Sequence, residues 1–131
     1  MPEVLRLIGF NWVAIVILMA NYLTELDCVF RALSDPTRRA VVQQLVNAPA
    51  SVKALAEPFD MALPSFMKHL AVLEDTGLIT STKSGRVRTC RLLPRRLMVA
   101  DDWLQEQLGI WEGLMQRLAE HVEVVPPVED A

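Results

Sequence analysis

Positively charged side chains are concentrated in one part of this 131-residue chain. From Arg31 to Arg96 there are eleven lysines and arginines but five acidic residues, a formal charge of +6. The rest of the chain holds two arginines and eleven acidic residues, so the net charge of −3 hides the asymmetry. A basic surface that meets phosphate groups produces such a pattern. The types and spacing of these residues therefore point to nucleic acid as a partner.

The basic residues are densest from residue 79 to residue 96, where six occur without an acidic residue. Residues 79–82 and 87–93 are rich in β-branched side chains and predict two strands, with Gly85 in the turn between them. This hairpin is either a solvated edge kept soluble by its charge or a surface for phosphate contact. The candidates for phosphate contact are Lys83, Arg86, Arg88 and Arg91.

The residues before the hairpin predict two short helices joined by a turn. Ser51 is expected to cap a helix over residues 52–57. A second helix is expected over residues 63–76, and Gly77 fits the left-handed conformation that follows a helix end. The order of helix, turn, helix and hairpin is the plan of a winged helix, which places the second helix in the major groove of DNA.

The second of these helices is amphipathic. Its expected core face consists of apolar residues three and four apart: Leu63, Phe66, Leu70 and Leu73. Its opposite face holds small and polar residues that allow the close approach of another molecule: Pro64, Ser65, Lys68, Ala71 and Val72. We expect Pro64, Ser65 and Lys68 to contact DNA, with Ser65 and Lys68 bonding base edges or phosphate.

Three further positions are candidates for DNA contact. Lys53 lies in the helix before the turn. Arg38 and Arg39 lie in the first turns of an earlier helix, and we expect one of them, with Arg38 as the candidate, to reach phosphate. The other is expected to pair with an acidic residue of a neighbouring helix. His69 flanks the core face, where a structural hydrogen bond competes with a phosphate contact.

Two helices are predicted before the helix-turn-helix. Thr24 is expected to cap the first, and one face of this helix carries Leu26, Phe30 and Leu33. Asp35 and Pro36 are expected to start the second, as an N-cap followed by a proline at the first helical position. The expected buried face of this second helix consists of Val41, Val42 and Leu45.

The last predicted helix covers residues 97–122. Apolar residues alternate along it at spacings of four and three, which is a coiled-coil-like seam: Leu104, Leu108, Trp111, Met115, Leu118 and Val122. Trp103, Ile110 and Leu114 form a second stripe beside the seam. One stripe is expected to pack on the domain, and a second copy of the same helix is the simplest partner for the other. Burial of both stripes within one chain is the alternative.

The N-terminal residues 1–23 hold 17 apolar residues. The uncharged stretch 7–23 is at the lower length limit of a membrane span. We favour the hypothesis that translation starts at Met19 and that residues 1–18 are an upstream extension. An extra helix packed into a dimer and a membrane anchor are the alternatives.

Three segments together resemble the ArsR-type winged-helix repressors of bacteria: LDCVFRALSDPTRRAVVQQL, LPSFMKHLAVLEDTGLI and SGRVRTCRL. The resemblance covers about residues 26–122. It implies a homodimer joined through the first and last helices, binding to a pseudo-palindromic operator, and repression of a nearby promoter. The implied dimer interface contains Leu26 and Phe30 of the first helix as well as the seam of the last.

The chain departs from the family pattern at two positions of the second helix of the pair. The family often has a polar residue where this chain has Ala62, the N-cap, and a polar residue where it has Met67. We expect Asp60 or Pro64 to compensate for Ala62, by moving the cap upstream or by stiffening the helix start. A methionine contacts a thymine methyl group but bonds phosphate poorly. These departures keep open a second hypothesis, a protein-interaction module with weak DNA binding.

Metal sensing is not implied by the resemblance. Metal-sensing relatives carry paired cysteines on the helix before the turn, and residues 54–59 hold none. Others use aspartate and histidine on the last helix, where this chain has His121 among carboxylates, whereas zinc favours nitrogen and sulfur donors. The two cysteines, Cys28 and Cys90, indicate a reducing cytoplasm. We expect both to act as small apolar residues, with a thiol redox switch as the alternative.

These patterns predict a mainly α-helical fold with a small β-hairpin, a winged helix-turn-helix with terminal dimerisation helices. The chain divides into an apolar extension (1–23), a DNA-binding domain (24–96), a dimerisation helix (97–124) and a tail (125–131). The sequence motifs of phosphate-binding loops, serine hydrolases and zinc proteases are missing. We expect a dimeric cytoplasmic regulator of transcription that binds double-stranded DNA, is not an enzyme, and uses no metal or cofactor. A membrane-tethered regulator is a further alternative.

Overall fold

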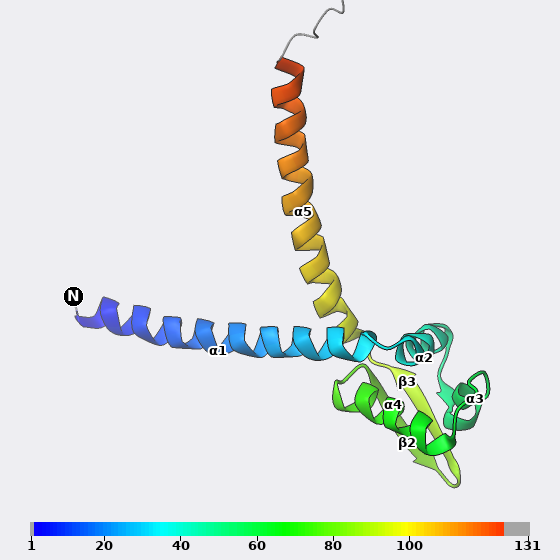
Figure 1. The fold of residues 1–131 in the computed structure, drawn as a ribbon. Coiled ribbons are helices and arrows are strands. Elements are labelled where there is room, and N and C mark those ends of the chain that lie inside the picture. Colours follow the sequence, from blue (N-terminus) through cyan, green and yellow to red (C-terminus); the bar gives the residue numbers. More distant parts are fainter. Residues whose placement is uncertain (1, 125–131) are drawn as a thin grey trace, which may run out of the picture. The chain divides into compact units, whose positions relative to one another are not determined.

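A computed structural model describes the backbone of residues 2–124 and the side chains of residues 12–122. These residues form five helices and three strands (Figure 1). The chain divides into two compact units, residues 1–100 and 101–131. The first unit contains the helix-turn-helix and the hairpin. The tail expected over residues 125–131 lies outside the described residues.

The first helix, α1 (Pro2–Leu33), is much longer than the sequence analysis predicts. Thr24 lies inside this helix, and its hydroxyl donates a hydrogen bond to the carbonyl oxygen of Ala20 at 2.9 Å. The prediction that Thr24 caps a helix start is therefore wrong. A threonine hydroxyl can bond the carbonyl four residues earlier without interrupting a helix. The helix continues without a break up to Thr24, because residues 12–23 contain no proline or glycine.

Large apolar side chains cover α1 on all sides between Trp12 and Leu23, and they are 45–66% exposed. Residues 12–33 are long enough to cross a membrane, and an 18-residue window within them has a mean hydropathy of 1.7. The last part of this stretch is nevertheless buried within the protein, at Leu26, Val29 and Ala32. Insertion of the whole stretch into a membrane would remove these side chains from the interior of the domain.

The second helix, α2 (Pro36–Asn47), begins where the sequence predicts. The carboxylate of Asp35 accepts a hydrogen bond from the backbone N–H of Arg38 at 3.1 Å, and Pro36 is the first helical residue. This confirms the predicted N-cap. The predicted buried face is also confirmed, because Val41, Val42 and Leu45 are all buried.

The sheet has three strands: β1 (Ala50–Ser51), β2 (Ile79–Ser84) and β3 (Val87–Leu92). They are antiparallel in the order β1-β3-β2. The predicted hairpin is confirmed, but the sequence pattern does not predict β1, which pairs Ala50 with Cys90. Two residues are too few to show alternation, and only the contact with β3 makes them a strand. The sheet therefore joins the segment before the helix-turn-helix to the hairpin that follows it.

The helix-turn-helix consists of α3 (Val52–Ala56) and α4 (Leu63–Asp75). The hydroxyl of Ser51 accepts from the backbone N–H of Ala54 at 3.1 Å, which confirms the predicted cap of α3. At the end of α4, Gly77 has φ of +76°. The N–H of Gly77 bonds the carbonyl of Glu74, and the N–H of Leu78 bonds that of Leu73, both at 3.0 Å. This is a Schellman motif, and it turns the chain into β2.

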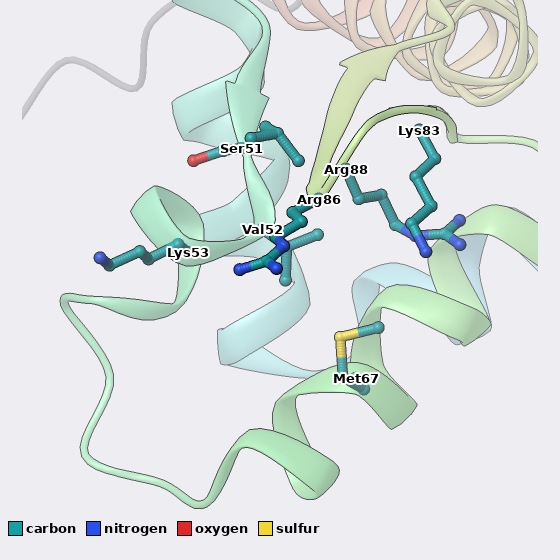
Figure 2. Close-up of a pocket in the computed structure, with 8 residues that line it drawn as sticks. Ser51, Val52, Lys53, Met67, Lys83, Arg86 and Arg88 are labelled. Atoms are coloured by element: carbon teal, nitrogen blue, oxygen red, sulfur yellow. The ribbon is translucent and has the colours of Figure 1, made fainter.

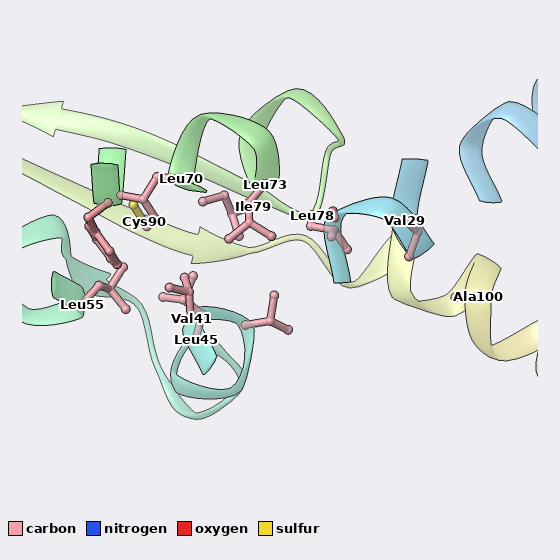
Figure 3. Packing of buried hydrophobic residues seen from close by; sticks show 13 residues of the cluster. Val29, Val41, Leu45, Leu55, Leu70, Leu73, Leu78, Ile79, Cys90 and Ala100 are labelled. Atoms are coloured by element: carbon pink, nitrogen blue, oxygen red, sulfur yellow. The ribbon is translucent and has the colours of Figure 1, made fainter. Parts of the chain in front are cut away.

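The core lies between α1, α2, α4 and the sheet, and Figure 3 shows its side chains. Helix α4 contributes Phe66, Leu70 and Leu73 to it, all at most 3% exposed. Leu63, predicted on the same face, is 57% exposed, so its assignment to the core is wrong. Leu63 is the first residue of α4, and helical side chains lean toward the N-terminus, which carries this one past the end of the core.

The last helix, α5 (Pro94–Val124), starts three residues earlier than predicted. Its first turns belong to the first unit, where Ala100 is buried in the core. Arg95 and Arg96 each lie near the carboxylate of Glu25 in α1, at 3.7 and 3.5 Å. The remainder of α5 makes up the described part of the second unit.

Replacement of Gly77 with alanine should lower the free energy of unfolding by roughly 1–2 kcal/mol, because an L-residue is disfavoured in the left-handed conformation. The added Cβ would also lie 3.2 Å from Nε of Arg96. Denaturation in urea measures the change. Gly77→Asn is the control and should lose less, because asparagine tolerates this conformation better. Equal stability of the wild-type and Gly77→Ala proteins would contradict the argument.

Candidate nucleic-acid interface

A groove of about 390 Å³ opens between α3, α4 and the β2–β3 hairpin (Figure 2). The hairpin contributes Lys83, Arg86, Val87 and Arg88 to its lining, α3 and its cap contribute Ser51, Val52 and Lys53, and α4 contributes Met67. The structure thus brings together four of the predicted DNA-contacting cations from segments about thirty residues apart. The groove contains no acidic lining residue and suits a negatively charged ligand.

The hairpin carries cations on its paired strands, Lys83 and Arg88, and at its turn, Arg86. Lys83 pairs with Arg88 across the two strands, so their side chains lie side by side. Nη1 of Arg88 donates to the hydroxyl of Ser81 at 3.0 Å, and that hydroxyl donates to the carboxylate of Glu74 at 2.9 Å. This chain of hydrogen bonds connects the hairpin to the end of α4. Arg86 follows the turn glycine, Gly85, whose φ of +61° matches the predicted turn.

The outer face of α4 is open to solvent, as the amphipathic pattern predicts. Pro64, Ser65 and Lys68 are all exposed, whereas Phe66 between them is fully buried. The helix starts at Leu63 with Ala62 in the N-cap position, where no side chain forms a cap hydrogen bond. The expected shift of the cap to Asp60 is therefore wrong. Backbone N–H groups of residues 65 and 66 both bond the carbonyl of Ala62 instead.

Arg38 and His69 are held together away from this outer face. Nε of Arg38 donates to the carbonyl of Ala32 at 2.7 Å, and Nη1 lies 3.2 Å from Nδ1 of His69. Nδ1 of His69 also lies 3.6 Å from the carboxylate of Asp35. The two side chains thus connect the end of α1, the start of α2 and α4. For His69 this arrangement favours the structural role over the phosphate contact.

Arg39 has a similar role. Its Nη1 donates to the carbonyl of Leu33 at 2.8 Å, while Nη2 of Arg38 donates to the carbonyl of Arg31 at 3.3 Å. The last carbonyls of a helix lack intrahelical partners, and arginines commonly fill this need. The sequence predicts phosphate and a carboxylate as the partners of these arginines. The sequence pattern does not indicate the α1 carbonyls, which lie six or seven residues earlier in the chain and come within reach at the turn between α1 and α2.

Burial alone would raise the pKa of the Asp35 carboxyl, but the hydrogen bond from the backbone N–H of Arg38 and the charges of His69 and Arg38 outweigh it. The net pKa of Asp35 is therefore below its ordinary value of 3.8. At Cys90, burial raises the pKa of the thiol, and the nearby Glu74 carboxylate raises it further. Cys90 is 1% exposed, and both cysteines are free thiols. A raised pKa disfavours the reactive thiolate.

Besides Arg88, which is exposed but bonds Ser81, five predicted cations are exposed: Lys53, Lys68, Lys83, Arg86 and Arg91. Within residues 12–122, no hydrogen bond or ion pair with another side chain engages them. Three of the five line the groove, and Lys68 lies on the outer face of α4. Arg91 lies farther along β3, opposite Thr80. Among the same side chains, no group of three or more histidines, cysteines or carboxylates is placed to hold a metal ion.

Comparison with known proteins finds similarity to helix-turn-helix regulators of transcription. A family model described as a helix-turn-helix domain matches residues 33–82. The chain is 35% identical to the HTH-type transcriptional regulator Rv2034 of Mycobacterium tuberculosis over 54% of its own length and 66% of the relative's. It is 34% identical to the transcriptional repressor SdpR of Bacillus subtilis over 44% of its length and 64% of the relative's. The chain thus spans just under two thirds of these curated relatives.

A solved crystal structure of an ArsR family transcriptional regulator is 53% identical to this chain. The match has a TM-score of 0.65 and covers 68% of this chain and 92% of that protein. The match confirms the winged-helix architecture that the sequence predicts.

Replacement of Asp35 with alanine should lower the free energy of unfolding at pH 7 by about 1 kcal/mol, because the helix loses its cap. Asp35→Asn keeps a cap but removes the charge, so it should cost less. The pKa of Asp35 is lowered in the folded state. The extra stability of wild type over Asp35→Asn is therefore complete above pH 3.8 and is lost as the pH falls through the folded-state pKa. Denaturation at several pH values tests this, and a pH-independent difference would contradict it.

Proposed function

The chain belongs to the ArsR family of transcriptional regulators, and we propose that it acts in the cytoplasm as a homodimeric repressor that binds a pseudo-palindromic operator. One observation carries the proposal. The exposed outer face of α4 and a groove lined by Lys53, Lys83 and Arg86 lie next to each other. A helix that enters the major groove needs such an open face. Cations beside the helix bind the flanking phosphates and thereby fix its position on the duplex.

The residues divide into two roles. Ser65 and Lys68 of α4 bond base edges, and Pro64 allows the backbone to approach the groove closely. Lys53, Lys83 and Arg86 bind phosphates beside α4, while Arg91 extends the positive surface along β3. The bonds of Arg38 and His69 within the chain give them a different task, which is to hold α4 in place.

The exposed seam of α5 supports the dimer. Leu104, Leu108, Trp111, Met115, Leu118 and Val122 are 38–67% exposed and repeat at coiled-coil spacing. A seam of this kind is stable when a second helix covers it, and an isologous pair is the simplest arrangement. Phe30 of α1, 38% exposed, remains a candidate for the same interface. Leu26 is 5% exposed and has little surface left for a partner.

The dimer explains how two recognition helices reach DNA together. In a two-fold arrangement the two α4 helices would lie about 34–36 Å apart and meet successive major grooves on one side of the duplex. Repression would follow when the bound dimer blocks a promoter. A ligand that favours a different spacing of the two helices would release it.

Removal of single cations should weaken DNA binding in distinguishable ways. Arg86→Ala should reduce the salt dependence of the binding constant by about one counterion, with a similar loss on all duplexes, because it binds phosphate. Lys68→Ala should cost about 1–3 kcal/mol on the upstream DNA of the protein's own gene and less on random DNA, because it reads bases. Fluorescence anisotropy in a salt series measures both.

Arg95→Ala is the matched control. This arginine is 80% exposed and lies at the far end of β3 from the hairpin turn, so its loss should leave DNA affinity nearly unchanged. Weak, salt-insensitive binding that is equal on the two DNAs would instead favour the protein-interaction module, which the missing side-chain cap at Ala62 also motivates.

Charges placed in the α5 seam should separate the dimer. We expect the double variant Leu108→Asp with Trp111→Asp to sediment as a monomer at micromolar concentration and to lose affinity for the upstream DNA, since two buried carboxylates destabilise the interface. Gln116→Asp, which adds a charge on the opposite side of the same helix, should remain dimeric. If the double variant remained dimeric, the dimer interface would not be the α5 seam.

A further inference from the structure

Two exposed apolar side chains border the basic groove, and phosphate binding does not account for them. Leu63 and Met67 are four residues apart in α4 and therefore share one side of the helix. They are 57% and 38% exposed. Val52 and Lys53 lie beside both: they line the basic groove together with Met67, and an adjoining apolar groove together with Leu63. Leu63, Met67 and Val52 are hereafter called the apolar strip.

The groove beside Met67 is lined by cations and no carboxylate, whereas the groove beside Leu63 is lined by Lys53 and Glu57. Met67 points from α4 into the groove that Lys83, Arg86 and Arg88 line on the opposite side (Figure 2). Lys53 borders the strip at α3. A partner that fits this surface carries negative charge at its edges and an apolar group between them. A duplex seen from its major groove has this layout, with phosphates on both sides and base edges in the middle.

We propose that Leu63 and Met67 recognise the C5-methyl groups of thymines in the operator, an inference that rests on the proposed function. Of the four bases, thymine is the one that offers a methyl group in the major groove. A leucine side chain has no hydrogen-bonding atom, and a thioether is a weak acceptor, so neither discriminates bases by hydrogen bonds. Each selects a base by burying an apolar group against it.

This assignment gives the two sides of α4 separate tasks. Ser65 and Lys68 bond polar base edges, whereas the side with Leu63 and Met67 selects thymine. Polar residues at these two positions would instead favour other bases or phosphate. The operator half-site is therefore expected to contain thymines next to the positions that Lys68 reads.

The experiment compares duplexes that differ only in thymine methyl groups. A duplex is first enriched from a random pool by selection with the full-length protein, and each thymidine of the selected site is then replaced in turn by deoxyuridine. Uracil keeps the pairing and the hydrogen-bonding groups of thymine and lacks its methyl group. We expect wild type to lose about threefold to fivefold in affinity at one or two thymines per half-site, the effect of one methyl group left unburied.

The variant Met67→Ser should bind the thymidine and deoxyuridine forms equally at the position that Met67 contacts, and Leu63→Ser should do so at its own. Val46→Ser, at an apolar residue of α2 that is 63% exposed and outside the groove, is the control and should keep the wild-type preference. Circular dichroism confirms that all variants are folded.

Two results would overturn the proposal while leaving the proposed function intact. One is selective DNA binding with no loss at any deoxyuridine, and the other is an unchanged thymine preference in both Met67→Ser and Leu63→Ser. Either would assign the apolar strip to a protein partner. Failure of the selection to enrich any site would overturn the proposed function itself, and this proposal with it.

Discussion

The burial of one face of α4 is the constraint on which the interface depends. Phe66, Leu70 and Leu73 fill the core, so their apolar contacts fix the rotation of the helix about its axis. The residues that can meet another molecule are then those left on the other sides. The Schellman turn at Gly77 and the buried Leu78 fix the end of the helix and direct the chain into β2. The hairpin cations consequently stand beside the outer face of α4 at a defined place.

A second set of contacts holds this core from the side of the first two helices. The guanidinium groups of Arg38 and Arg39 bond the last carbonyls of α1, and Arg38 also reaches His69 of α4. The carboxylate of Asp35 caps α2 and lies near the same histidine. Polar groups at the end of α1 and the start of α2 thus bond one another and also reach His69 in the middle of α4. A loop that turns between two helices gains a fixed geometry from such mutual bonds.

Much of this structure follows from local patterns in the sequence. The caps at Asp35 and Ser51 and the left-handed Gly77 depend on neighbours within a few residues, and all are found as predicted. The predictions fail where contacts between distant residues determine the structure, or where the sequence marks the end of a helix only weakly. The strand β1 exists only through its pairing with β3, Leu63 is exposed because the core ends before it, and α1 continues through Thr24. At the interface, the sequence indicates the cations, but it does not indicate which of them bond the carbonyl groups of α1.

The missing cap at Ala62 has a consequence for the evolution of the protein. A serine or threonine in this position would add about 0.5–2 kcal/mol to the stability of α4, and either differs from alanine by one nucleotide in the codon. The lineage therefore has unused stability within a single mutational step. Such a reserve would let α4 accept destabilising changes on its outer face, where new sequence preferences arise, without loss of the folded state.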